Sequence, residues 1–557
     1  MFSAQTLADV LRYSPAAQLS FDNFDVPSLQ KLDPANRWVV LAEIVPWDDL
    51  ALVLAASPTA PKLNGPGRPT CDLRLVMAAL LVQQIECLSD ERTLELIREN
   101  VYVQFFCGLL GFQTEAPFDA SSLTHWRAWL GDAGAAALSE TLADVLEARR
   151  REARRSAGES APDRSGADDD GGSAGGAASV NQGTLLIDAT CAPADVRYPT
   201  DAALLDQARR SLERIVDVLW AASLAAGCAP ATKPRTYRRK ARKSFAAFSR
   251  RRRPSGKVAR RERRRQLQYV ERDLGHADAL LDGLRATGAH ERALSARDYK
   301  RLLVSRELAR QQRHMHDTRA RRCDDRIVSL SQPHVRPIVR GKAGARVEFG
   351  PTIGAAEKLD VSLSEGIARV ECVSFDAYHE GAIAIAACER YRERHGRYPA
   401  RILADGAYLS RANERYFRAR GIDCKAKPKG RPPKDAAKLA AYERAMAEAD
   451  RPGERNPIEG WFGLAKRRYR LGRLRTRRAA VKTGEVFLIA MAVNLTAELA
   501  RVVAALIGPI VHLLRSLVVT TPTQSHLHHQ LVGVAALSTA RPPQRRRATT
   551  RLASILQ

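Results

Sequence analysis

The sequence lacks paired cysteines and long uninterrupted hydrophobic runs, and both absences narrow the class of protein. Nine cysteines are scattered among 557 residues, and no two of them form a Cys-x-x-Cys pair. This pattern excludes a disulfide framework and a zinc ribbon, and it indicates reduced, mostly buried thiols. The N-terminus shows no basic segment followed by an apolar one, so we expect no secretory signal. The most apolar late stretch, residues 502–519, is interrupted by Pro509 and Arg515, which argues against a membrane span.

Acidic residues are also scarce relative to basic ones. The chain has 89 lysines and arginines against 62 aspartates and glutamates, which gives a formal net charge of +27. A surplus of this size attracts polyanions, and nucleic acid is the commonest large polyanion in a cell. The length exceeds what one compact core accommodates, so we expect two or three domains.

Changes in composition divide the chain into four regions. Residues 1–150 place apolar side chains at helical spacing and predict a helical, DNA-binding N-terminal domain; a helix-turn-helix module and a plain helical core both fit the pattern. Residues 151–182 contain a stretch rich in Gly, Ala, Ser and Asp, which predicts a flexible linker. Residues 183–500 mix strand and helix patterns and form the expected second domain. Residues 501–557 carry no motif with chemistry and are predicted to be a disordered tail.

The second domain begins with a strand that is followed by a long basic segment. Residues 184–187 are apolar and lead to Asp188, whereas residues 200–325 show helical periodicity. Within that segment, 17 of the 33 residues from 233 to 265 are lysine or arginine. Strands are then expected at 326–330, 346–350, 358–362, 368–374, 400–406 and 423–427, and helices at 381–396, 410–421 and from Asn456 onward. This order predicts an α/β, ribonuclease-H-like fold with a basic helical insertion after its first strand.

Three acids occupy positions where they could bind metal. Asp188 and Asp405 each end an apolar strand, and Glu459 opens a helix. Each acid alone has an ordinary explanation, because aspartates form turns and acids favour helix N-termini. Together and in this order they favour a site for two Mg²⁺ ions, with Mn²⁺ as a substitute, since such ions prefer carboxylate oxygens and can cleave phosphodiesters.

Cationic and aromatic residues accompany Glu459. Lys466 follows it by seven positions, and residues i and i+7 share nearly the same helix face, so Lys466 would point toward bound phosphate. Arg455 lies one turn before Glu459, just ahead of the helix. Trp461 could stack on an unpaired base at a DNA end, although core packing is the more ordinary role for an aromatic residue.

The spacing Arg455-x3-Glu459-x6-Lys466 resembles the signature of DDE transposases from bacterial insertion sequences. Pro452 stands where that signature has a tyrosine, which is a departure from the family. Other segments resemble the two aspartate regions of these enzymes and an InsH-like N-terminal domain: residues 186–193, 198–201, 331–342, 404–408, 67–69, 88–90, 98–100 and 118–123.

The resemblance implies a cytoplasmic, Mg²⁺-dependent enzyme that binds the terminal inverted repeats of its own element, cuts there and joins the ends to target DNA. Asp188, Asp405 and Glu459 match the catalytic triad of the family. We expect Asp188 to bridge two metal ions, with Asp405 and Glu459 each binding one. The expected partner is double-stranded DNA, bound by a homo-oligomer, with no membrane partner. The expected DNA contacts are Arg455, Trp461, Lys466, Arg467, Arg470, Arg238, Arg239, Lys240, Arg251 and Arg252.

Three other functions stay open at this point. A nuclease of the same fold would use the same carboxylates without joining ends. A non-catalytic DNA-binding descendant is disfavoured by the intact set of three acids. A basic RNA-binding protein would leave the strand-ending carboxylates unexplained.

Overall fold

The computed structural model describes residues 32–56, 71–156, 181–196, 199–320, 322–336, 356–375, 381–424, 428, 430–449 and 453–519. The chain divides into two compact units, Met1–Leu499 and Ala500–Gln557. All the elements below belong to the first unit, except the C-terminal part of the last helix.

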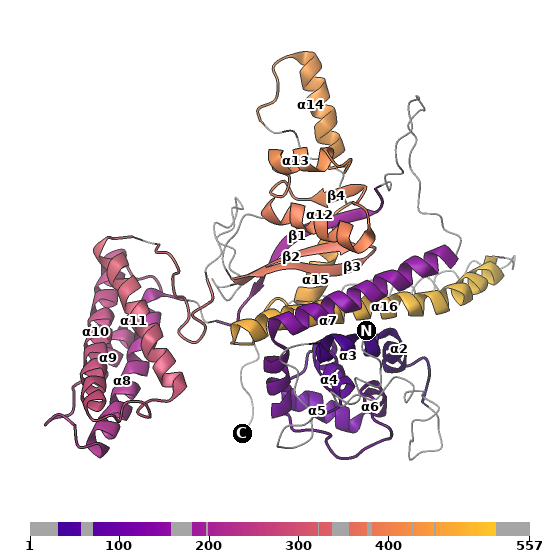
Figure 1. The fold of residues 1–557 in the computed structure, drawn as a ribbon. Helices are drawn as coiled ribbons and strands as arrows, with labels where there is room; N and C mark the ends of the chain where they lie inside the picture. Colours follow the sequence, from indigo (N-terminus) through magenta and orange to yellow (C-terminus); the bar gives the residue numbers. More distant parts are fainter. Residues whose placement is uncertain are drawn as a thin grey trace, which may run out of the picture. The chain divides into compact units, whose positions relative to one another are not determined.

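Helices make up the described N-terminal part of the chain. They are α2 (Arg37–Ile44), α3 (Trp47–Ala55), α4 (Leu73–Glu86), α5 (Asp90–Glu99), α6 (Val101–Phe106) and α7 (Ser121–Ser156) (Figure 1). Side chains that accept an early backbone N–H open four of them: Asn36, Asp72, Ser89 and Asn100. α4 is buried on nearly every side, and the rings of Trp38 and Trp47 both lie 5.2 Å from that of Phe106. The predicted helical region therefore has a packed core.

α7 is one long element that is broken at Gly131. Gly131 has a φ of +61°, which interrupts the helix. It also contacts α16 (Ala479–Val519): a Cβ at Gly484 would lie 2.4 Å from the Gly131 carbonyl oxygen, so this approach requires glycine. α7 continues to Ser156, so the first six residues of the predicted linker 151–182 are helical. Residues 157–180 lie outside the described part of the chain.

Four strands form a mixed sheet in the order β3-β2-β1-β4 (Figure 1). They are β1 (Thr184–Pro193), β2 (Ala356–Ser364), β3 (Ile367–Ser374) and β4 (Arg401–Ala404). β1 pairs antiparallel with β2 and parallel with β4, and β2 pairs antiparallel with β3. The turn between β2 and β3 contains Glu365 and Gly366, both at positive φ, as a tight hairpin requires. β1 is thus an inner strand of the sheet.

Helices pack against this sheet. They are α12 (Gly381–His395), α13 (Arg411–Arg418) and α15 (Asn456–Arg468), and α14 (Ala436–Ala449) precedes α15. Leu185, Ile187 and Ile402 pack in one cluster with residues of α12 and α13. Successive strand residues face opposite sides, so Asp188 faces away from this cluster. α15 contacts β1 and β2, and its first turn meets Asp188.

The structure corrects the strand predicted at residues 326–330. No strand forms there because the segment belongs to a helical core: the Ile327 N–H donates to the Gln311 side chain at 2.9 Å, and Ile327 packs among buried leucines. The strand expected at 423–427 is reduced, in the described residues, to an isolated bridge beside β4. The strand expected at 346–350 lies outside the described residues.

The first strand also differs from its prediction, because it does not end at Asp188. β1 continues to Pro193 along β2, whereas its pairing with β4 stops where Ile187 meets Ala404. Asp188 therefore lies where β1 loses one of its two neighbours. This position exposes one edge of the strand without ending the strand.

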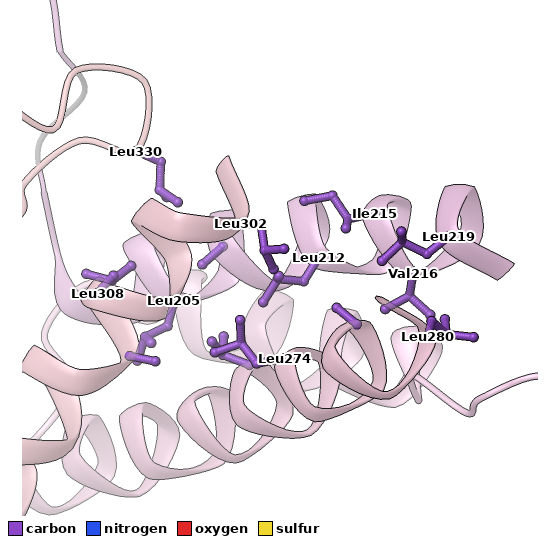
Figure 2. Packing of buried hydrophobic residues seen from close by; sticks show 14 of the residues in the cluster. Leu205, Leu212, Ile215, Val216, Leu219, Leu274, Leu280, Leu302, Leu308 and Leu330 are labelled. Carbon is purple, nitrogen blue, oxygen red and sulfur yellow. The ribbon is translucent and has the colours of Figure 1, made fainter. Parts of the chain in front are cut away.

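Three helices of the predicted insertion share a core of their own: α8 (Asp201–Ala225), α10 (Gly256–Ala286) and α11 (Ala296–Asp317). The fourth, α9 (Arg238–Ser249), packs against α8 and α10. Figure 2 shows aliphatic side chains of this core, among them Leu205, Leu212, Val216, Leu274, Leu280, Leu302 and Leu308. α9 buries only Ala241, and most of its other residues are polar or charged. The basic residues of this region consequently lie mostly on its surface.

α16 corrects the prediction of a disordered tail in part. It runs to Val519, so residues 501–519 are helical, and residues 520–557 lie outside the described residues. Its segment Ala479–Ala505 is long and apolar enough to cross a membrane, and 56% of its apolar window is buried within the protein. Lys482 and Asn494 in this segment are buried and bond to Gln332 and to the backbone of β3. These contacts are those of a core helix.

Candidate active site

Asp188 and Asp405 come together where β1 and β4 stop pairing. Ile187 and Ala404 form the last register pair, and each aspartate directly follows its member of that pair. The Asp188 side chain is half-buried and Asp405 is exposed, and the two carboxylates lie close enough to interact electrostatically. The sheet thus joins two acids that are far apart in the sequence.

α15 brings an arginine and the third acid to the same face. Arg455 is the N-cap residue, and its Nη2 donates to Asp188 Oδ2 at 2.8 Å. Pro457 occupies the first turn, where its missing N–H costs no hydrogen bond. Glu459 lies in the same turn and is exposed. The helix start therefore brings Arg455 to β1, with the exposed Glu459 one turn further along α15.

The surroundings raise the pKa of Asp188 above its ordinary value. Burial is the largest cause, and the negative charge of Asp405 acts in the same direction. Arg455 and the Ala189 N–H, which donates to Asp188 Oδ1 at 2.8 Å, act in the opposite direction. A half-buried carboxylate beside a second one is stabilised by any added cation.

The donor chemistry of these residues fits a hard divalent cation, since it consists of carboxylate oxygens. Asp188 and Asp405 would be the first two ligands, and Glu459 a third from the neighbouring helix. In the part of the chain that the structure describes, no three His, Cys, Asp or Glu side chains stand close enough to hold one ion. Arg455 is bound to Asp188, and Glu459 is exposed.

A clamp that sequence analysis missed connects β4 to the start of α15. The Arg401 guanidinium donates to both carboxylate oxygens of Glu454, at 3.2 and 2.5 Å. Arg401 is the first residue of β4, which leads to Asp405, and Glu454 directly precedes Arg455. Both charges were visible in the sequence, but no local pattern pairs residues 53 positions apart.

The remaining candidates on α15 differ in their placement. Trp461 is buried and packs edge-on against Phe462, so the structure gives it the core role rather than a surface for stacking a base. Lys466 is half-buried, and Arg467 is exposed. Arg470 donates to the backbone carbonyl between α4 and α5, which ties the end of α15 to the N-terminal helices.

The basic candidates of the insertion fall into two groups. Arg238 donates to both oxygens of Asp217 at 3.0 Å, so it takes part in an ion pair within the helical core region. The other four are exposed on or beside α9: Arg239, Lys240, Arg251 and Arg252. These four side chains therefore present exposed charge to a partner.

Comparison with known proteins agrees with this geometry. Residues 27–129 match a family model described as a transposase domain (DUF772), and residues 402–496 match a transposase DDE domain. A Rhizobium meliloti protein described as uncharacterized protein ORF8 in nfe locus is 32% identical over 185 residues, which cover 33% of this chain and 74% of that protein. The chain belongs to the DDE transposase family. No solved structure shows a significant match to this transposase.

Family membership makes the chain a transposase enzyme and implies that it uses a divalent metal ion. The matched DDE segment contains Asp405 and Glu459, whereas Asp188 precedes it. The register of β1 with β4 places Asp188 beside the start of that matched segment. The sheet, rather than the matched segment alone, therefore completes the set of acids.

Proposed function

We propose that this transposase binds the terminal inverted repeats of an insertion sequence, cleaves the DNA ends and joins them to target DNA. The observation that carries the proposal is the adjacency of Asp188 and Asp405 on neighbouring parallel strands, with Glu459 on the helix beside them. Acids gathered from three elements at one sheet edge suit phosphoryl transfer between DNA strands.

The sheet supports a ribonuclease-H-like assignment for the catalytic domain, which we place at residues 183–500. Its order β3-β2-β1-β4 has antiparallel neighbours on one side of β1 and a parallel neighbour on the other. The helices of residues 200–325 follow β1 as an insertion. Residues 1–150 would read the inverted repeat in the major groove.

Asp188, Asp405 and Glu459 would hold two Mg²⁺ ions, for which Mn²⁺ could substitute. When bound, such ions activate the attacking oxygen and stabilise the leaving one. The chain's own residues orient the DNA: Arg455 and Lys466 would hold phosphates next to the scissile bond. Water would attack the phosphodiester at the element's end and break its P–O3′ bond, which frees a 3′-hydroxyl on the element and leaves a 5′-phosphate on the flanking strand. That hydroxyl would then attack a target phosphodiester, form a new P–O bond and release the 3′-hydroxyl of the broken target strand.

The exposed cations of the insertion would bind the DNA backbone without regard to sequence. Arg467 would extend this contact along α15. We further propose that the enzyme works in the cytoplasm as a homo-oligomer, because two ends must be brought together before they are joined.

The test is a reaction of the full chain with a labelled duplex carrying the element's own end, together with supercoiled plasmid, with and without Mg²⁺. The variants are Asp188→Asn and Glu459→Gln, and Glu443→Gln on α14 is the matched control that loses one exposed acid elsewhere. We expect cleavage and joining in wild type and control, and loss of both in the two site variants.

Other outcomes would each change the assignment. Cleavage without joining would favour a nuclease. Tight DNA binding without metal-dependent cleavage would remove the catalytic roles of the three acids. Loss of activity in Glu443→Gln as well would show that the assay reports charge or folding rather than the site.

A further inference from the structure

Both oxygens of the Asp188 carboxylate already have partners. Oδ1 accepts the Ala189 N–H at 2.8 Å, and Oδ2 accepts Arg455 Nη2 at 2.8 Å. The Ala189 amide belongs to β1 and is fixed by the sheet, whereas Arg455 reaches Asp188 with a long side chain. A cation that binds Oδ2 on the side that Arg455 occupies therefore displaces Arg455, whereas the amide contact at Oδ1 stays in place.

The Arg455 guanidinium donates a hydrogen bond to Asp188, but not all of its N–H groups have partners among the described residues. Its Nε is buried and has no hydrogen-bond partner among the described residues. Its backbone is held by the clamp between Glu454 and Arg401, so the side chain can move while its anchor stays in place. The backbone of Arg455 is thus held in place while its guanidinium is only partly hydrogen-bonded, which suits a contact with Asp188 that can form and break.

We propose that Arg455 is an internal counter-cation for Asp188, which holds the carboxylate in the metal-free enzyme and is displaced when a divalent ion binds. The inference rests on the proposed metal-dependent function. Arg455 and the ion compete for the same oxygen, so metal loading frees a guanidinium beside the site. The freed Arg455 is the cation assigned above to a DNA phosphate, and metal binding and DNA binding thereby support each other.

The test measures Mn²⁺ binding to the full chain without DNA, by the loss of the free-ion paramagnetic signal and by calorimetry. Arg455→Gln removes the competitor, and we expect about fivefold tighter binding, the scale of a partly exposed ion pair. Arg455→Lys keeps a weaker competitor and should lie between the two, which keeps the test valid if the glutamine variant folds poorly. Arg444→Gln on α14 removes one exposed positive charge away from the site and should bind like wild type.

A double-mutant cycle identifies the oxygen concerned. In an Asp188→Asn background, Arg455→Gln should no longer change Mn²⁺ affinity, because the contested oxygen has lost its charge. Unchanged or weaker binding in Arg455→Gln overturns the inference, and so does a tightening that persists in the Asp188→Asn background. If wild type shows no Mn²⁺ binding that depends on Asp188, the proposed metal site falls together with the inference.

Discussion

Asp273 of α10 is fully buried, and neither of its carboxylate oxygens has a hydrogen-bond partner among the described residues. Burial raises its pKa to about 8, and the nearby Glu213 acts in the same direction against Arg209, Arg272 and Arg238. A raised pKa in the folded state favours folding at low pH. That contribution is complete below the ordinary aspartate value of about 4 and is lost as the pH rises toward 8.

We therefore expect Asp273→Asn to be more stable than wild type at pH 8.5 by about 1 to 3 kcal/mol, the cost of an unsatisfied buried group. At pH 5 the difference should be much smaller, because Asp273 is protonated in the folded protein. Urea unfolding followed by circular dichroism measures both values. Asp324→Asn changes an exposed aspartate and should show no such dependence; equal differences at the two pH values would contradict the assignment.

The Arg401–Glu454 clamp predicts a second residue-scale effect. Glu454→Gln weakens the hold on the start of α15, and a misplacement on the order of 1 Å can cost about 100-fold in rate. We expect cleavage to slow by at least about tenfold while the melting temperature changes little, because Glu454 is partly exposed. Rate recovery in the charge-swapped double variant Arg401→Glu with Glu454→Arg would show that the pair itself matters. No recovery would assign the loss to something other than the pair.

At the scale of elements, the exposed cations around α9 should control how DNA binding depends on salt. Neutralising Arg239, Lys240, Arg251 and Arg252 removes up to four phosphate contacts. The slope of log affinity against log salt should become shallower by about 3 to 4. Fluorescence anisotropy with a random duplex measures the slope. The control neutralises four exposed arginines elsewhere in the insertion: Arg285, Arg292, Arg306 and Arg310. The same change of slope in both sets would contradict a DNA contact localised at α9.

Elements with a strong local pattern were predictable from the sequence. The alternation at 358–362 and 368–374 predicted β2 and β3, and the helical spacing at 381–396 predicted α12 almost residue by residue. Contacts between distant elements were not predictable, because they depend on register. The pairing of Ile187 with Ala404 and the clamp of Arg401 with Glu454 join residues with no shared local signal.

The same limit applies to single side chains. The spacing predicts Arg455 as a phosphate ligand, and the fold adds that Arg455 donates to Asp188. Trp461 sits on a basic helix, yet burial decides that it packs in the core. A single sequence gives the chemistry of a side chain but not the residues that contact it in the fold.

At the scale of the whole molecule, Arg369 of β3 links the sheet to the N-terminal helices. It is almost fully buried and pairs with Glu140, Asp144 and Glu147 of α7 at 2.8, 2.9 and 2.6 Å. Arg369→Ala leaves Glu147 buried without its main partner, so we expect a loss of about 3 to 5 kcal/mol in unfolding free energy.

Urea unfolding of the full chain measures this loss. The double variant Arg369→Met with Glu147→Gln removes both charges and should recover much of the stability, because paired charges buried together are costly to separate but not to replace. A single variant as stable as wild type would show that the contact carries no net stabilisation.

The position of the insertion also has a consequence during synthesis. β1 has two strand partners, β2 and β4, and both are encoded after the insertion: Leu186 pairs with Leu363 and with Leu403. At roughly 5–20 residues per second, a ribosome needs on the order of ten to thirty seconds to deliver the first partner. During this time the insertion can fold through its own local contacts, whereas both edges of the apolar strand β1 stay unpaired. The nascent chain therefore passes through an interval in which β1 is a target for chaperones and for aggregation.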